Sequence, residues 1–207
     1  MTQKKKNKTA KGLSLAVIIG GCMVIFGWIS DIGVLKSLSP SWVSMKLATA
    51  ISFVLSGITL YSIVRAREGE IEKAQVALSL TSLILVLLMG TLFFSALLKI
   101  HTGVENLFVH EWADAVKTAA PGRPSIPTML NFLLIASAGV LTLLNPAKVR
   151  TKLRAIGLIV GAIGALAVVG YILNAPLLYY FREGISSGLA LHTALLFILL
   201  GIGLLCL

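Results

Sequence analysis

Six long stretches of the chain contain no charged residue, and they constrain the fold more than any other feature of the sequence. They are 18 to 27 residues long and cover residues 12–30, 47–64, 74–98, 124–147, 155–181 and 184–207. A helix needs roughly 20 apolar residues to cross the ~30 Å hydrocarbon core of a bilayer. The stretches do not alternate between apolar and polar residues, as the strands of a membrane barrel do. We therefore predict an all-α membrane protein with six transmembrane helices.

The composition agrees with this class. Only 13% of the 207 residues are charged and 57% are hydrophobic, whereas a soluble domain carries about 25% charged residues. Disorder is excluded, because a disordered chain has too few apolar residues to form a core. Two cysteines are too few for a disulfide framework, and we expect Cys22 and Cys206 to be small buried apolar residues.

The basic residues predict the orientation in the membrane. Twelve of the eighteen Lys and Arg lie before the first stretch or in the loops after the second and fourth: Lys4, Lys5, Lys6, Lys8, Lys11, Arg65, Arg67, Lys73, Lys148, Arg150, Lys152 and Arg154. The other six are spread over longer loops. Lys and Arg are enriched on the cytoplasmic side, so we expect both termini to be cytoplasmic and the protein to lie in the cell membrane.

The net charge of +10 is thus mostly a topology signal. A basic stripe with interleaved aromatic residues is absent from the sequence, so we predict no nucleic-acid partner. We expect membrane lipids as partners, and the basic tail 1–11 is suited to contact anionic lipid.

The six stretches form three similar hairpins, at about 12–64, 74–147 and 155–207. The returning helix of each hairpin carries Thr, Phe and a small residue at positions i, i+4 and i+8, which share one helix face. These residues are Thr49, Phe53 and Gly57; Thr128, Phe132 and Ala136; and Thr193, Phe197 and Gly201. The first outward stretch contains Gly27-Trp28 near its end, and the fifth contains Gly170-Tyr171.

Two interpretations of this stripe remain open. One is a packing seam between hairpins, because a small residue permits close helix approach and a Thr hydroxyl can bond a neighbouring helix. The other is a ligand groove lined by three Phe. Neither interpretation requires a cofactor, and lipid is the bound molecule we expect first.

Histidine chemistry offers one further candidate. His192 lies inside an apolar stretch, where a polar residue is a functional candidate, and Gly188 four residues earlier would leave room for a flat macrocycle. The alternative is a polar contact near the outer end of the helix, and no other stretch contains the second histidine of a bis-histidine haem. His101 and His110 lie in the outer loop 99–123 without metal-site spacing, so we predict no metal. In that loop, apolar residues at helical spacing over 104–117 predict a short interfacial helix anchored by Trp112.

The apolar stretches contain no Asp, Glu, Lys or Arg. Ion-coupled transporters normally place such groups at membrane depth, so charged-substrate transport is disfavoured. Asn131 is the one amide well inside a stretch, and we expect it to form a hydrogen bond between helices. Phosphate-loop, nucleophile-elbow and zinc signatures are absent from the sequence, so we predict that the protein is not an enzyme.

Two segments resemble a known family. They are Pro121-Gly122-Arg123-Pro124-Ser125-Ile126-Pro127-Thr128 with the following Leu130–Leu134, and Gly170-Tyr171 followed by Leu189–Gly201. They are similar to the N-terminal multi-pass membrane regions of microbial sensor histidine kinases and GGDEF diguanylate cyclases. The resemblance implies a sensory input module that relays an outer-face or intramembrane cue to a cytoplasmic output domain.

The kinase and cyclase parts of that family are not in this sequence, so the resemblance assigns no catalytic residue. The final apolar stretch ends at Leu207 without a flanking base, and we expect a cytoplasmic continuation there. A sensor of this kind is expected to be a homodimer. The alternative is an accessory or scaffold subunit of a larger membrane complex, which holds lipid or pigment against other membrane subunits.

Overall fold

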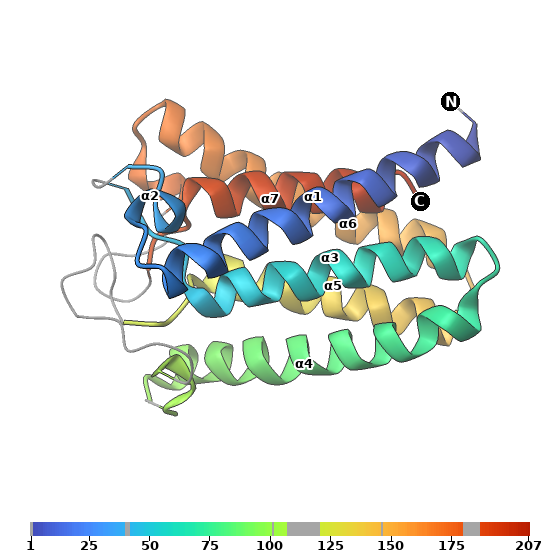
Figure 1. The fold of residues 1–207 in the computed structure, drawn as a ribbon, viewed down its shortest axis with the longest axis horizontal. Helices are drawn as coiled ribbons and strands as arrows, with labels where there is room; N and C mark the ends of the chain where they lie inside the picture. The colour runs from blue at the N-terminus through green and yellow to red at the C-terminus, as the bar shows by residue number, and fades with distance from the viewer. Residues whose placement is uncertain (1, 40–41, 101, 107–120, 146, 180–186) are drawn as a thin grey trace.

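The computed structural model describes residues 2–39, 42–100, 102–106, 121–145, 147–179 and 187–207. In these ranges the chain is helical and contains no strand, which confirms the all-α prediction (Figure 1). The elements are α1 (Gln3–Ile29), α2 (Gly33–Lys36), α3 (Leu47–Arg67), α4 (Ile71–Leu98), η1 (Val104–Asn106), α5 (Ile126–Leu144), α6 (Val149–Ile172), η2 (Pro176–Leu178) and α7 (Leu191–Leu205).

Five helices in the described ranges are long and apolar enough to cross a membrane: α1, α3, α4, α5 and α6. The sixth expected span is shorter than its apolar sequence. Helix α7 has 15 residues, which at 1.5 Å per residue is about 22 Å. Residues 187–190, which precede α7, are buried but not helical. An apolar stretch of sufficient length therefore contains both a buried extended segment and a short helix.

Other element boundaries also differ from the sequence prediction. The basic tail is not separate, because α1 begins at Gln3 and carries these lysines on its first turns. Of the expected interfacial helix, Val104–Asn106 forms a 3₁₀ turn, and residues 107–120, including Trp112, His110 and Lys117, lie outside the described ranges. Cys22 is exposed on α1 and Cys206 is half-buried, so the prediction of buried cysteines is wrong for Cys22.

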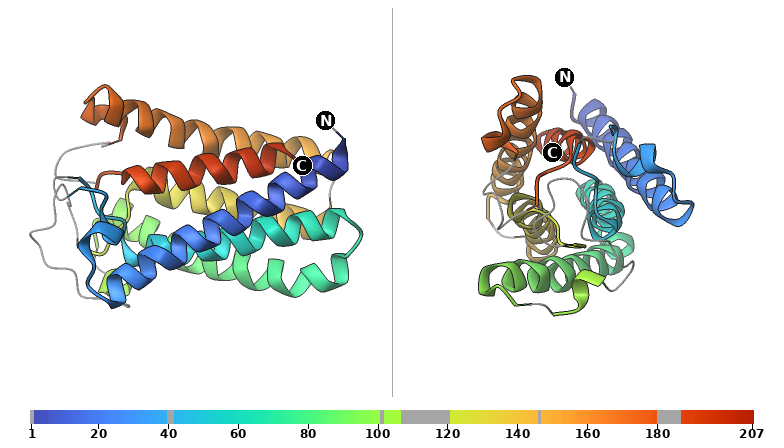
Figure 2. Two further views of the ribbon diagram at one scale, coloured as in Figure 1. Left: turned by 45° about the horizontal axis from the view of Figure 1, so that its top comes forward. Right: turned by 90° about the vertical axis from the view of Figure 1, so that its left-hand side faces the viewer.

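The long helices of the described ranges form a bundle in which α1, α4 and α6 lie outside α3, α5 and α7 (Figure 2). The returning helices α3, α5 and α7 surround the bundle axis. Each outer helix contacts the inner helix that follows it and one more: α1 contacts α3 and α7, α4 contacts α5 and α3, and α6 contacts α7 and α5. Burial follows this arrangement, since 67% of the apolar window of α3 is buried and only 28% of that of α1.

The three outer helices end in similar turns. Each is closed by a residue in the left-handed region: Asp31 at φ 52°, Lys99 at φ 56° and Asn174 at φ 50°. The next backbone N–H donates to a carbonyl five residues earlier, at 2.8 Å for Ile32 to Gly27, 3.1 Å for Ile100 to Ser95 and 2.8 Å for Ala175 to Gly170. This is the hydrogen bond of a Schellman cap, which satisfies a free carbonyl at a helix end.

One end of the bundle collects most of the positive charge. Both chain termini lie at this end, together with the α3–α4 and α5–α6 turns (Figure 1). The twelve Lys and Arg that predict the orientation belong to these segments. We call it the basic end. The opposite end is called the outer end, after the orientation that the sequence predicts.

Candidate functional site

The three phenylalanines of the repeated stripe meet at the bundle axis. The ring centroids of Phe53 and Phe132 are 4.9 Å apart, those of Phe53 and Phe197 4.8 Å, and those of Phe132 and Phe197 5.0 Å. All three side chains are 0% exposed. Tilted and edge-to-face pairs at such distances are the favoured geometries of aromatic rings. The three rings therefore pack against one another, and we call them the Phe triad.

The threonines of the stripe lie one turn nearer the outer end. Thr49, Thr128 and Thr193 are each three residues after the N-cap of their helix, and each is buried. The N-cap residues have similar extended backbones, with φ near −69°, −68° and −65°. In α5 the cap is a side chain, since the Ser125 Oγ accepts the Thr128 N–H and lies 2.7 Å from its Oγ1. The inner helices thus begin with one common geometry.

The two glycines of the stripe face the other helix of their own hairpin. A Cβ on Gly57 would lie 2.5 Å from Cγ1 of Ile18 and 2.8 Å from the Ser14 carbonyl oxygen, both on α1. A Cβ on Gly201 would lie 2.6 Å from the Cα of Gly161 on α6. Ala136 is buried on α5.

The seam expected between hairpins therefore divides into two parts. The Phe triad connects the three hairpins to one another, whereas Gly57 and Gly201 hold the two helices of one hairpin together. The division follows from the 3.6-residue period, because a residue four positions further along the helix is rotated by about 40°.

Two aromatic side chains form hydrogen bonds with the non-helical segments that precede α3 and α7 at the outer end. The indole N–H of Trp28 donates to the Met45 carbonyl at 2.9 Å, and the hydroxyl of Tyr171 donates to the Leu189 carbonyl at 3.1 Å. Each aromatic residue follows a glycine against which the turn packs: a Cβ on Gly27 would lie 2.5 Å from Leu35, and one on Gly170 2.7 Å from Leu178. The paired Gly-aromatic motifs in the sequence are the signal for this arrangement.

The second hairpin has a buried ion pair at the same level. Nη2 of Arg123 donates to Oε1 of Glu105 at 2.8 Å, and also to the Ser95 hydroxyl at 2.8 Å and the Ile100 carbonyl at 2.9 Å. Ser95 donates to the same carboxylate. Gly122 has φ +70°, and a Cβ there would overlap the Glu105 backbone, so the turn before α5 closes tightly over Glu105.

The charge of Glu105 is stabilised by its partners. Burial alone raises the pKa of this carboxyl, but the hydrogen bonds from Ser95 and Arg123 and the charge of Arg123 outweigh it and hold the pKa at about 2. The sequence pattern did not indicate this pair. The two residues are far apart in the chain, and the motif Pro121-Gly122-Arg123-Pro124 was the one signal of a tight turn.

His192 is the second residue of α7 and is half-buried. Its Nε2 is buried and has no hydrogen-bond partner in the part of the chain that the structure describes. Gly188 is not on the same helix face, because α7 begins only at Leu191. The expected Gly–His face is therefore not formed. Within the described ranges, no group of three His, Cys, Asp or Glu side chains is placed to hold a metal ion.

Asn131 lies on α5 beside the Phe triad and is 0% exposed. Neither its Nδ2 nor its Oδ1 has a partner among the described residues, so the expected hydrogen bond between helices is not formed there. A hydrogen bond between helices occurs instead between Thr59 and Thr81, at 2.8 Å.

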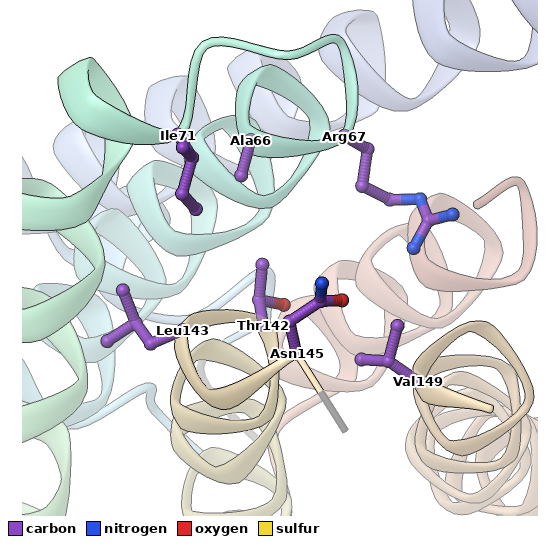
Figure 3. Close-up of a pocket in the computed structure, with 7 residues that line it drawn as sticks. All are labelled: Ala66, Arg67, Ile71, Thr142, Leu143, Asn145 and Val149. Carbon is purple, nitrogen blue, oxygen red and sulfur yellow. The ribbon is translucent and has the colours of Figure 1, made fainter. Parts of the chain in front are cut away.

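A pocket of about 320 Å³ opens at the basic end (Figure 3). It lies between the α3–α4 turn and the α5–α6 turn and is lined by Ala66, Arg67, Ile71, Thr142, Leu143, Asn145 and Val149. Arg67 reaches into this space from the end of α3, Thr142 from α5 and Asn145 from the C-cap of α5 (Figure 3). The sequence analysis used Arg67 only to predict the orientation in the membrane, and no local sequence pattern indicated the pocket.

Comparison with known proteins gives no further assignment. No protein-family model, no curated protein and no solved structure matches the chain.

Proposed function

We propose that this chain is a non-enzymatic sensory input module of the cell membrane. In this proposal all six apolar stretches cross the membrane as three repeated hairpins, with both termini in the cytoplasm. A cue at the outer face or within the membrane shifts one hairpin against the others, and the shift reaches a cytoplasmic output domain. The module acts as a homodimer.

The position of α7 is the observation that carries this proposal. Helix α7 contacts α1, α3 and α6, and its Phe197 contacts Phe53 and Phe132 of the other two hairpins. Its C-terminal end lies at the basic end, beside the N-terminus (Figure 1). Because packed interiors move between discrete arrangements rather than deforming continuously, a shift of α3 or α5 at the Phe triad is passed to α7.

The repeated turns support the three-hairpin part of the proposal. A residue with left-handed backbone and the same kind of hydrogen bond end each of α1, α4 and α6. The same N-cap geometry begins α3, α5 and α7. Three similar units around one axis are suited to relay motion from any of them to the end of α7.

The test joins a diguanylate cyclase catalytic domain after Leu207 and measures its product in cells. We expect Phe197→Leu to change the output at unchanged protein level, because it alters the contact between hairpins. The matched control is Phe94→Leu, since Phe94 is 62% exposed on α4. Equal output from the parent and Phe197→Leu fusions, with active cyclase in both, would contradict the sensory role.

An accessory subunit that holds lipid or pigment is the second candidate. The observation that favours it is the buried Nε2 of His192, which has no hydrogen-bond partner among the described residues. An imidazole nitrogen is a good axial ligand for the iron of a haem. A visible absorption band in protein purified from its own membrane, lost in His192→Ala, would support this function. Membrane subunits that co-purify at a fixed ratio would support it too.

A further inference from the structure

One arginine lines the pocket at the basic end, and two more lie near that arginine. Arg67 lines the pocket and is half-buried, and Arg150 and Arg154 on α6 are close enough for their positive charges to act on it. In the described part of the chain, none of the three forms an ion pair. The Nε of Arg154 is buried and lacks any hydrogen-bond partner there.

Of the three acidic residues near the α3–α4 turn, Glu72 is exposed on α4, and Glu68 and Glu70 are engaged by other bases. Glu68 accepts from Nζ of Lys11 at 2.6 Å and from the amide of Asn7 at 3.2 Å. Glu70 accepts from Nη2 of Arg65 at 2.5 Å. Glu68 therefore neutralises a lysine of α1, and Glu70 neutralises an arginine near the end of α3. Neither carboxylate neutralises Arg67, so the charge around the pocket stays positive.

The polar atoms of the pocket fit an anion with several oxygens. A guanidinium donates in a planar fork that matches phosphate, and it binds phosphate better than a lysine does in such geometry. The hydroxyl of Thr142 donates to the Ala138 carbonyl, so the donors left for an anion are the guanidinium of Arg67 and the amide N–H groups of Asn145. The amide of Asn145 lies at the pocket with a donor and an acceptor (Figure 3).

The rest of the lining is apolar, and in the proposed orientation it lies at the cytoplasmic boundary of the membrane. Ile71, Leu143 and Val149 form this part, and the neighbouring Leu144 is 71% exposed. A free phosphate ion would leave these side chains uncovered, whereas the glycerol and acyl groups of a lipid would cover them. Basic pockets between helices on the cytoplasmic side are suited to anionic headgroups.

We propose that the pocket between the α3–α4 and α5–α6 turns binds the phosphate of an anionic membrane phospholipid, held by Arg67 with Arg150 and Arg154. The bound headgroup joins the turn after the first hairpin to the turn before the third. The inference uses the orientation proposed above, but not the sensory role. A lipid-binding measurement on the purified chain therefore succeeds or fails independently of any signalling output.

The experiment measures lipid bound to the purified full chain by native mass spectrometry. The protein is placed in nanodiscs of phosphatidylcholine with one-fifth phosphatidylglycerol, and retained lipid is compared for the parent, Arg67→Gln, Arg154→Gln and the double variant. We expect selective retention of phosphatidylglycerol by the parent and a loss on the order of fivefold for each arginine removed.

Lys152→Gln is the matched control, because it removes the same charge from an exposed position on the same turn of α6. It should retain the lipid as the parent does. Helical circular dichroism and the elution volume in detergent verify that each variant is folded, and Arg150→Gln, at an exposed position, is a second variant if Arg67→Gln does not fold.

Two results would overturn the proposal. One is equal retention of the two lipids by the parent, and the other is an equal loss of phosphatidylglycerol in Lys152→Gln and in the arginine variants. Inorganic phosphate is titrated into the same samples to separate the two sources of the anion. Displacement of the lipid by phosphate at millimolar concentration would assign the site to a free anion and reject the lipid.

Discussion

The ring centroid of Phe53 lies 4.8 Å from that of Phe197, although the two residues belong to the first and the last hairpin of the chain. Phe132 completes the contact from the second hairpin, and the three side chains are fully buried. One residue type at one position of each returning helix thus forms the centre of the bundle. The contact holds α3, α5 and α7 together around a common axis.

The first prediction concerns this centre. Phe132→Ala should lower the free energy of unfolding by about 3 kcal/mol or more, because it removes a large side chain and leaves a cavity between three helices. Phe94→Ala should have a small effect, since Phe94 is 62% exposed on the outside of α4. Unfolding of both variants in mixed micelles with increasing SDS measures the difference. Equal destabilisation would contradict a role for the triad in packing.

The second prediction concerns the glycine contacts within a hairpin. Gly201→Ala should destabilise the protein by about 1–3 kcal/mol, because the added Cβ would lie 2.6 Å from the Cα of Gly161, and backbone cannot yield as a side chain does. Gly201→Leu should destabilise the protein more than Gly201→Ala does.

Gly90 is the matched control for this prediction. It is also inside a long helix, but a Cβ there meets nothing within 4 Å. Gly90→Ala and Gly90→Leu should therefore both fold, with thermal unfolding of the detergent-solubilised protein as the measurement. A tolerated leucine at Gly201 would remove the close contact between α6 and α7 from the explanation of the fold.

The sequence was sufficient for the helical class and for the stripe that carries the Phe triad. Spacing of four residues places Thr, Phe and the small residue on neighbouring positions of one face, whatever the tertiary structure. This spacing does not predict how far each helix is rotated about its own axis. Whether Phe53 faces another hairpin while Gly57 faces α1 depends on a rotation of some tens of degrees, which packing decides.

Two other features were beyond the sequence for different reasons. The length of α7 was overestimated, because apolar residues such as Leu189 and Ala190 are buried equally well in an extended segment that hydrogen-bonds to Tyr179 and Tyr171. The pair of Glu105 and Arg123 forms across a loop, and no local pattern indicates which of the outer charged residues will meet.

The third prediction concerns orientation. After replacement of Cys22 and Cys206 by Ser, a cysteine at Lys99 should react with a membrane-impermeant maleimide in intact cells, because Lys99 caps α4 at the outer end. A cysteine at Lys73, near the start of α4 at the basic end, should react only after permeabilisation. The reverse pattern would place the basic end outside the cell and overturn the proposed orientation.

The fourth prediction concerns pH and the Glu105–Arg123 pair. The folded pKa of Glu105 is about 2, below its ordinary value of 4.5, so its ionised form stabilises the fold. This contribution is fully present above pH 4.5 and is lost as the pH falls toward 2. Glu105→Gln should therefore destabilise the protein by roughly 3 kcal/mol at pH 7, since it leaves Arg123 buried without its partner charge. The difference from the parent should shrink between pH 4.5 and pH 2.5 in unfolding measurements. Glu72→Gln, at an exposed carboxylate of α4, should show no such trend, and a constant difference for Glu105→Gln across this range would contradict the stabilising role of its charge.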